Sequence, residues 1–111
     1  MRTRYPLIFL LNILLMNFES ANAQNLDVGK KVFFENCSVC HKGGNNIILP
    51  EKNLRKETLR TNGMNSETAI MYQVTNGKNG MPAFGGRLSE NEIHSVAIYV
   101  LDQADKDFKS E

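Results

Sequence analysis

The chain has 111 residues, and its 13 Lys and Arg against 12 Asp and Glu give a formal net charge of +1. This near-balance argues against nucleic-acid binding, which requires a basic surface. The length allows one small domain, and a domain of this size usually needs a cofactor, a metal or a disulfide to stabilise it.

The first 23 residues have the pattern of a cleavable signal peptide. Two arginines supply positive charge, residues 7–16 form an apolar run, and the Ala-Asn-Ala at 21–23 fits a small-residue cleavage site. The apolar run is about half the ~20 residues that a membrane-spanning helix needs, and an amphipathic anchor is the weaker interpretation. We therefore expect a signal peptide over 1–23, a mature domain over 24–111, and no stable membrane insertion of the mature chain.

The expected mature domain opens with a helix. Asp27 can cap a helix that runs from about Val28 to Cys37, because its carboxylate accepts free backbone N–H groups and suits the helix dipole. Gly29 costs such a helix stability relative to alanine. We therefore expect a second helix to cross closely at this glycine.

Cys37, Cys40 and His41 form the C-x-x-C-H pattern of covalent c-type haem attachment. Each thiol adds across one porphyrin vinyl group, and the next imidazole then lies under the iron. A thioredoxin-type redox disulfide is one alternative, but that motif belongs in a βαβ context that the flanking sequence lacks. Zinc needs about four ligands, and only His94 remains as an obvious additional one. We therefore predict one haem c per chain, with His41 as its first axial ligand.

The apolar run at 47–49 ends at Pro50 and has two interpretations. It is either a short buried strand or an apolar wall of the haem cleft. The second is favoured because a haem edge needs apolar walls. In that position we expect the Pro50 carbonyl to accept the free ring N–H of His41, a bond of the kind that fixes ligand orientation.

Three further helices complete an all-α fold of about four helices around the haem. A short one covers about 58–61, and the next runs from a cap at Asn65 or Ser66 to about Asn76, where a glycine follows. The last begins with a capping box formed by Ser89 and Glu92, and we expect it to cross the first helix. Its apolar stripe consists of Ile93, Val96, Ala97, Val100, Leu101 and Ala104.

The residue at the sixth iron position decides the function. Met81 is favoured because glycines surround it and Pro82 biases it toward extended geometry. We interpret Met64 as a residue that fills a gap in a turn, Met71 as a residue that packs within a helix, and His94 as a partly exposed surface residue. A thioether opposite an imidazole suits electron transfer, whereas an open site suits a c-type haem enzyme or gas sensor. We predict an electron carrier with His41 and Met81 as axial ligands and keep the open-site protein as the alternative.

These residues resemble the cytochrome c6 family, the small soluble class I c-type cytochromes of algae and cyanobacteria. The resemblance runs through essentially the whole expected mature chain and is most diagnostic over residues 72–88. It implies the class I cytochrome c fold and a single covalent haem. The site residues that it implies are Cys37, Cys40, His41 and Met81, with Gln73 beside the haem and Arg87 as the docking arginine.

The same resemblance implies a photosynthetic electron carrier and not an enzyme. Its partners would be cytochrome f of the cytochrome b6f complex, as donor, and photosystem I, as acceptor. Its location would be the thylakoid lumen of a plastid, or alternatively the thylakoid lumen or periplasm of a cyanobacterium. The single short export signal fits either origin, and Asn- and Lys-rich usage favours the plastid.

The basic residues near the site have two interpretations each. Arg87 follows the Met81 loop, so it is either at the rim of an exposed haem edge or a solvated charge before a helix. A second group is a candidate for propionate contacts or a second basic rim, although a solvated helix face is the simpler interpretation for most of its members. This group consists of Lys52, Arg55, Lys56 and Arg60.

Overall fold

The computed structural model describes residues 22–110, so nearly all of the expected signal peptide lies outside the described residues. An N-terminal helix covers residues 22–36, and helices connected by loops follow, with two isolated β-bridges and no named strand in the described range. No helix within residues 22–110 is long and apolar enough to cross a membrane. The remaining elements are α2 (Ser38–His41), η1 (Lys42–Gly44), η2 (Pro50–Lys52), α3 (Lys56–Thr61), α4 (Glu67–Asn76) and α5 (Glu90–Asp105).

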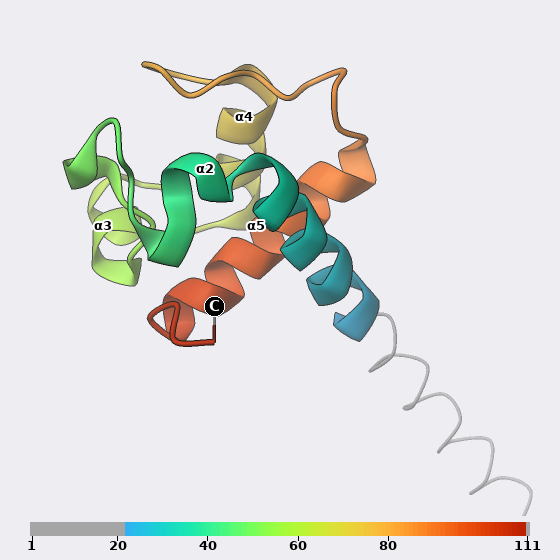
Figure 1. The fold of residues 1–111 in the computed structure, drawn as a ribbon, viewed down its shortest axis with the longest axis horizontal. Coiled ribbons are helices and arrows are strands. Elements are labelled where there is room, and N and C mark those ends of the chain that lie inside the picture. Colours follow the sequence, from blue (N-terminus) through green and yellow to red (C-terminus); the bar gives the residue numbers. More distant parts are fainter. Residues whose placement is uncertain (1–21, 111) are drawn as a thin grey trace, which may run out of the picture.

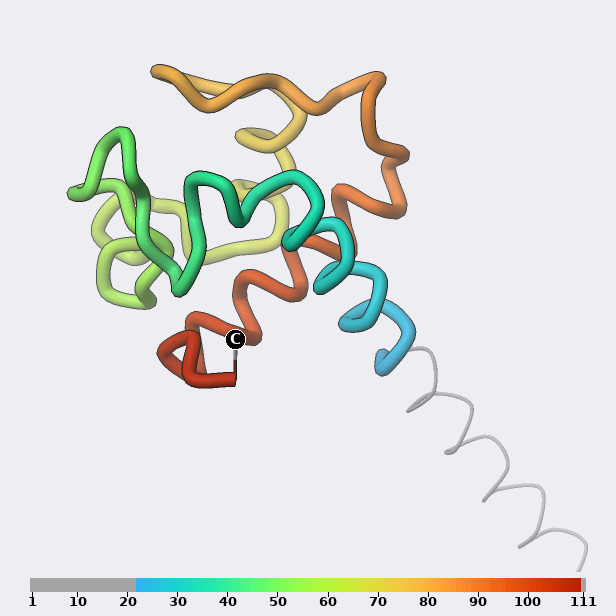
Figure 2. Tube along the Cα trace, viewed as in Figure 1, coloured from blue at the N-terminus to red at the C-terminus, as the bar shows by residue number. Residues whose placement is uncertain are grey.

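The N-terminal helix and α5 cross at the centre of the molecule (Figure 1). In Figure 1, α4 lies above this crossing and α3 lies to its left. The long connection between α4 and α5 runs as an extended arch along the upper edge, and the Cα trace shows the same path (Figure 2). The expectation of an all-α chain is confirmed for the described residues. The predicted Asp27 cap is wrong, because the helix already includes residue 22. Residues 22–26 contain no glycine or proline that would end a helix.

The helix crossing depends on Gly29, as predicted. A methyl group at this position would overlap the backbone carbonyl of Ser95 and approach the Cβ of Tyr99 to 2.7 Å. One turn further along, the Phe33 ring packs against the Tyr99 ring with centroids 5.4 Å apart. Glycine is therefore required here for close backbone approach.

The predicted start and stop of α4 and the predicted start of α5 are confirmed. Ser66 caps α4 by accepting from the backbone N–H of Ala69, and Gly77 ends it with φ of 69°. The capping box of α5 is complete, since Ser89 accepts from the Glu92 backbone N–H and the Glu92 side chain accepts from the Ser89 N–H. These local signals fix both helices before any tertiary contact is considered.

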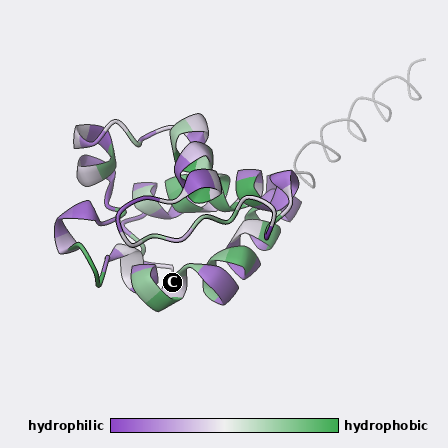
Figure 3. Ribbon diagram, turned by 90° about the horizontal axis from the view of Figure 1, so that it is seen from above, coloured by the Kyte–Doolittle hydropathy of each residue, from purple (hydrophilic) through white to green (hydrophobic). Residues whose placement is uncertain are grey.

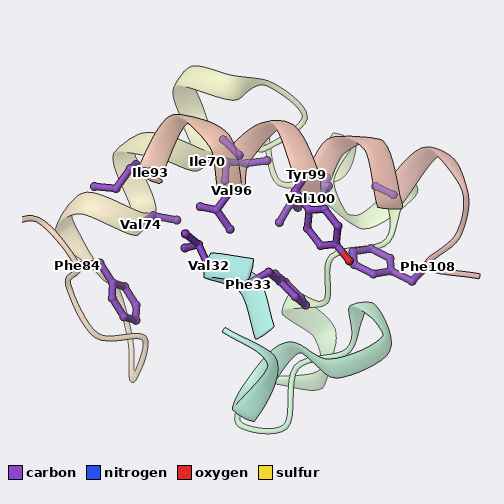
Figure 4. Packing of buried hydrophobic residues seen from close by; sticks show 13 residues of the cluster. Val32, Phe33, Ile70, Val74, Phe84, Ile93, Val96, Tyr99, Val100 and Phe108 are labelled. Carbon is purple, nitrogen blue, oxygen red and sulfur yellow. The ribbon is translucent and has the colours of Figure 1, made fainter. Parts of the chain in front are cut away.

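The core is built on the inner face of α5. Figure 4 shows Val32 and Phe33 from the N-terminal helix and Ile70 and Val74 from α4 pointing toward this helix. Figure 3 shows both hydrophobic and hydrophilic residues along the helices, as expected for helices that bury one side. The buried apolar residues of α5 are Ile93, Val96, Ala97, Tyr99, Val100 and Ala104.

Candidate haem site

An apolar-lined cavity of about 280 Å³ lies between the α2 region and the arch that connects α4 to α5. Five of the six predicted site residues line it, and Arg87 does not. The five are Cys37, Cys40, His41, Gln73 and Met81. Of the other candidate iron ligands, Met64 lines the cavity, whereas Met71 and His94 do not. Its apolar walls come from Ile48, Leu49, Leu54, Leu59, Met64, Ile70, Val74, Phe84, Val96 and Val100, among others.

The short helix α2 brings the C-x-x-C-H residues to one side of the cavity. The backbone N–H groups of Cys40 and His41 donate to the Cys37 carbonyl at 3.1 and 2.9 Å. Residues three and four apart in such a turn share a face. The two thiols and the imidazole therefore all face the same space, although the pattern spans only five residues.

The His41 ring is held by the backbone of the turn that follows it. Its Nδ1–H donates to the Asn45 carbonyl at 2.9 Å. The expected acceptor, the Pro50 carbonyl, was therefore wrong. Gly43 and Gly44, with φ of 68° and 79°, reverse the chain and return the Asn45 carbonyl to the ring.

This hydrogen bond selects the tautomer of the neutral imidazole. A carbonyl only accepts, so Nδ1 is protonated, and in the neutral ring Nε2 keeps its lone pair. Burial lowers the pKa of His41, and the smaller effect of the Asn45 hydrogen bond raises it. The ring is consequently neutral at pH 7, the state in which Nε2 can bind a metal ion.

The two cysteines are not paired as a disulfide. Burial, followed by the neighbouring Cys40, raises the pKa of Cys37 to about 11. No group of three or more His, Cys, Asp or Glu side chains suited to a metal ion occurs among the described residues. The surroundings of α2 also lack the βαβ setting of a redox disulfide, because residues 22–110 form no named strand.

Met81 enters the cavity from a tight two-residue turn. Lys78 and Met81 exchange backbone hydrogen bonds of 3.0 and 2.9 Å, with Asn79 and Gly80 at positive φ of 46° and 92° between them. An Asn-Gly pair is the usual sequence for such a turn, so the sequence contained a sharper signal for this geometry than glycine content alone. The turn fixes the position of Met81 in the lining of the cavity that His41 also lines.

Gln73 contacts Met81 directly, and Ile48 lies beside the neighbouring Gly80. The Gln73 Nε2 group donates to the Met81 sulfur at 3.6 Å. Ile48 approaches the Gly80 turn, since a methyl group on that glycine would lie 3.4 Å from the Ile48 Cγ2. Ile48 and Leu49 therefore line the cavity, whereas Ile47 is 69% exposed and does not; the run is not a buried strand, and Ile48 remains 52% exposed.

Arg87 does not line the cavity but contacts Phe84, which does. Its guanidinium carbon lies 4.8 Å from the centroid of the Phe84 ring, and Phe84 itself lines the cavity. Arg87 is exposed, so its charge is presented to solvent one side chain away from the cavity. The role of Phe84 was missed by the sequence reasoning, although it is an aromatic residue in the same loop as Met81.

The second basic group divides into one cavity residue and three ion pairs. Lys52 lines the cavity and donates to the Asn62 side chain at 3.5 Å. The other three face acidic partners on the surface, so the simpler interpretation holds for them. The pairs are Arg55–Asp107, Lys56–Asp105 and Arg60–Glu57.

Comparison with known proteins decides the family. A protein-family model described as cytochrome c oxidase, cbb3-type, subunit III matches residues 24–100. Cytochrome c6 of Bumilleriopsis filiformis is 57% identical over 82 residues, which cover 74% of this chain and 95% of that protein. Cytochrome c6 of a Synechococcus strain is 51% identical over 110 residues, which cover 97% and 98%. The crystal structure of cytochrome c6 from the diatom Phaeodactylum tricornutum matches with a TM-score of 0.72 and 51% identity, covering 74% of this chain and 97% of that chain.

The chain belongs to the cytochrome c6 family. The expected class I cytochrome c fold is thereby confirmed. Membership of the cytochrome c6 family also means that the chain carries a covalently bound c-type haem and belongs among the haem electron carriers.

The cavity fits this cofactor of the cytochrome c6 family. It offers two thiols in one helical turn, an imidazole, and the thioethers of Met64 and Met81 from separate segments. The remaining walls are largely apolar, as a porphyrin requires, and soft sulfur and imidazole donors suit haem iron. No buried carboxylate lines the cavity, so the chemistry of the donor set agrees with the haem.

Proposed function

We propose that Cys37 and Cys40 form the two thioether bonds to the haem and that His41 and Met81 are its axial iron ligands. In each thioether the thiol sulfur bonds to one vinyl carbon and the thiol proton passes to the other. The observation that carries this proposal is that two separate segments bring these four side chains to the same apolar cavity. The haem, when bound, supplies a one-electron redox couple.

The residues of the chain suit electron transfer more than catalysis. The apolar walls exclude water, the Asn45 carbonyl orients the imidazole, burial lowers its pKa and so favours the neutral ring, and Met81 lines the same cavity from a separate segment. If His41 and Met81 both bind the iron, no open position would remain for a substrate. Gln73, which donates to the Met81 sulfur, is the residue beside the haem that adjusts this ligand.

The specific role that we propose is transfer of single electrons from cytochrome f of the cytochrome b6f complex to photosystem I. The support is membership of the cytochrome c6 family together with an exposed arginine beside the cavity. Arg87 would steer an anionic partner surface toward Phe84 and the adjacent cavity edge. Weak steering with a small contact allows fast dissociation, which a shuttle needs.

The proposed location is the thylakoid lumen of a plastid, with a cyanobacterial lumen or periplasm as the alternative. Residues 1–23 would be removed as a signal peptide, leaving the domain 24–111. Mass spectrometry of the protein purified from its source would find Gln24 at the N-terminus. A species that retains the first 23 residues would contradict the processing.

Substitution of Met81 tests the ligand assignment. Met81→Ala should abolish the sulfur-to-iron charge-transfer band of the oxidised protein. The control is Met71→Ala, because Met71 packs against the core but does not line the cavity. A band that persists in Met81→Ala would overturn the assignment of Met81.

Carbon monoxide distinguishes the carrier from the alternative of a haem enzyme or gas sensor. The reduced native protein should not bind this gas rapidly, because Met81 occupies the sixth position. Met81→Ala should bind it readily. Rapid binding by the unaltered protein would favour the alternative with an open site.

A further inference from the structure

The C-terminal turn after α5 has an unusual backbone. Asp107 and Phe108 both have positive φ, at 55° and 56°. This left-handed conformation is uncommon for residues other than glycine and is an outlier for a bulky side chain. Strain of this kind persists only where the surrounding structure enforces it, and it often accompanies a functional constraint.

Phe108 is the part of the turn that the core enforces. Its ring is 5% exposed and packs against Phe33 with centroids 6.3 Å apart, and its backbone N–H donates to the Gln103 carbonyl at 2.8 Å. The same ring lies on Gly44, where a methyl group would come within 2.5 Å of it. The C-terminal turn is thus seated directly on the turn that follows His41.

Asp107 adds a polar connection to the same place. Its carboxylate accepts from one terminal nitrogen of Arg55 at 3.0 Å, and the other terminal nitrogen donates to the Asn45 side-chain oxygen at 3.4 Å. The Asn45 side-chain amide also donates to the Lys42 carbonyl at 3.2 Å. The main-chain carbonyl of Asn45 meanwhile accepts from His41.

We propose that the C-terminal turn is a positioning device for the His41 ring. Phe108 presses on Gly44, and Asp107 acts through Arg55 on Asn45, so both fix the carbonyl that orients the imidazole. This inference rests on the proposed role of His41 as an axial ligand. Asp107 and Arg55 are positioning residues, since neither lines the cavity.

The proposal has a consequence for the reduction potential. A firm Nδ1–H to carbonyl bond makes the imidazole a stronger donor, which favours the oxidised iron and lowers the potential. Loosening Asn45 should weaken this bond and raise the potential. Both Arg55→Gln and Asp107→Asn should therefore raise it.

The sign separates this mechanism from simple electrostatics. Arg55→Gln removes a positive charge, which by itself would lower the potential, whereas Asp107→Asn removes a negative charge, which would raise it. Two changes of opposite charge that shift the potential in the same direction indicate a shared structural link. Lys56→Gln is the matched control, because the Lys56–Asp105 pair has the same 3.0 Å separation and similar exposure but no contact with Asn45.

The experiment measures the midpoint potential and the paramagnetically shifted proton resonances of the His41 ring in the holoprotein. The expected result is a rise in potential and altered His41 resonances for Arg55→Gln and Asp107→Asn, with Lys56→Gln unlike both. Arg55→Lys keeps the charge and loses the forked contact, so it should alter the resonances in the same way. The double variant should shift the potential by less than the sum of the single variants.

Potentials that merely follow the sign of the charge, with unaltered His41 resonances, would overturn the proposal. Arg55–Asp107 would then be a surface ion pair of the same kind as Lys56–Asp105. Failure of the proposed function would look different. The unaltered protein would then lack the low-spin spectrum and the sulfur-to-iron band before any residue of the turn was changed.

Discussion

Gly29 lies so close to Tyr99 at the crossing of the N-terminal helix and α5 that a methyl group would come within 2.7 Å of the Tyr99 Cβ. This contact sets the distance between the two helices that carry most of the core. Because Cys37 follows the first helix directly, the crossing also places the haem-attachment turn relative to the core. The backbone contact at one glycine is thus connected to the position of the cofactor.

Gly29→Ala should destabilise the protein despite its better helix propensity. Propensity alone predicts a gain of about 1 kcal/mol, whereas overpacking at a tight contact typically costs about 1–3 kcal/mol. Urea unfolding of the holoprotein measures the difference. The control is Lys31→Ala on the exposed side of the same helix, which should change stability little. Unchanged or increased stability of Gly29→Ala would contradict the packing at the crossing.

Substitution of Gln73 should lower the reduction potential. Its Nε2–H group points at the Met81 sulfur, so the positive end of the amide dipole lies beside this ligand and favours the reduced state. Gln73→Leu keeps a similar volume and removes the donor. Potentiometry should show a lower midpoint potential while the sulfur-to-iron band is retained.

The matched control for this change is Asn76→Leu. Asn76 carries an amide on the same helix but does not line the cavity. Its side-chain amide donates to the Tyr72 carbonyl at 2.8 Å, so the change removes an amide donor and should leave the potential unchanged. An equal potential shift in both variants would show that the amide of Gln73 has no specific effect on Met81.

The local signals in the sequence identified much of this structure. The capping box at Ser89 and the glycine stop after Asn76 depend on neighbouring residues only, so both were predicted correctly. The pairing of His41 with Met81 in one cavity was also predicted, because each side chain had a distinctive local setting. The start of the first helix was missed, since no residue there forces a helix to begin.

Two features of the site depend on contacts between distant segments and were beyond local reasoning. The acceptor for the His41 ring is chosen by the path of the backbone through Gly43 and Gly44, which composition does not specify. The left-handed conformation of Phe108 arises from its burial against other segments and not from its own preference. Sequence patterns indicate which residues are needed, whereas tertiary packing decides which backbone groups they meet.

Substitution of Gly44 should destabilise the C-terminal turn. Gly44 has φ of 79°, and any Cβ there would come within 2.5 Å of the Phe108 ring. Gly44→Ala combines backbone strain with displacement of a buried ring, so we expect a loss of about 2–4 kcal/mol in the free energy of unfolding. Gly86→Ala is the control, because it has a similar φ of 81° but nothing within 4 Å. If both variants lose the same free energy of unfolding, backbone strain alone would explain the loss, and the contact with Phe108 would contribute nothing.

Acidification should reduce stability through His41. Burial holds the pKa of this ring below its usual value in the folded chain, so below pH ~6.5 the unfolded chain binds the extra proton. The free energy of unfolding should therefore fall as pH decreases from 7 toward 5, and ligation of iron by the neutral ring acts in the same direction. The chain has two histidines, so the measurement is made in His94→Gln, where His41 alone remains. A flat profile between pH 7 and 5 would contradict a buried neutral ring.

Reversal of the charge at Arg87 should slow electron transfer to an anionic partner. The exposed guanidinium stacks on Phe84 at the cavity edge, so Arg87→Glu places a repelling charge beside the proposed exit path of the electron. Stopped-flow rates with an acidic redox partner should fall most at low ionic strength and converge at high salt, because surface charges are screened within about 10 Å at 0.1 M. Arg87→Lys keeps the charge and should retain most of the rate. Lys106→Glu changes charge equally at the end of the chain, away from the cavity lining, and should slow the reaction less. If Arg87→Glu and Lys106→Glu react at the same rate at every ionic strength, Arg87 has no specific role in docking and acts only as a general surface charge.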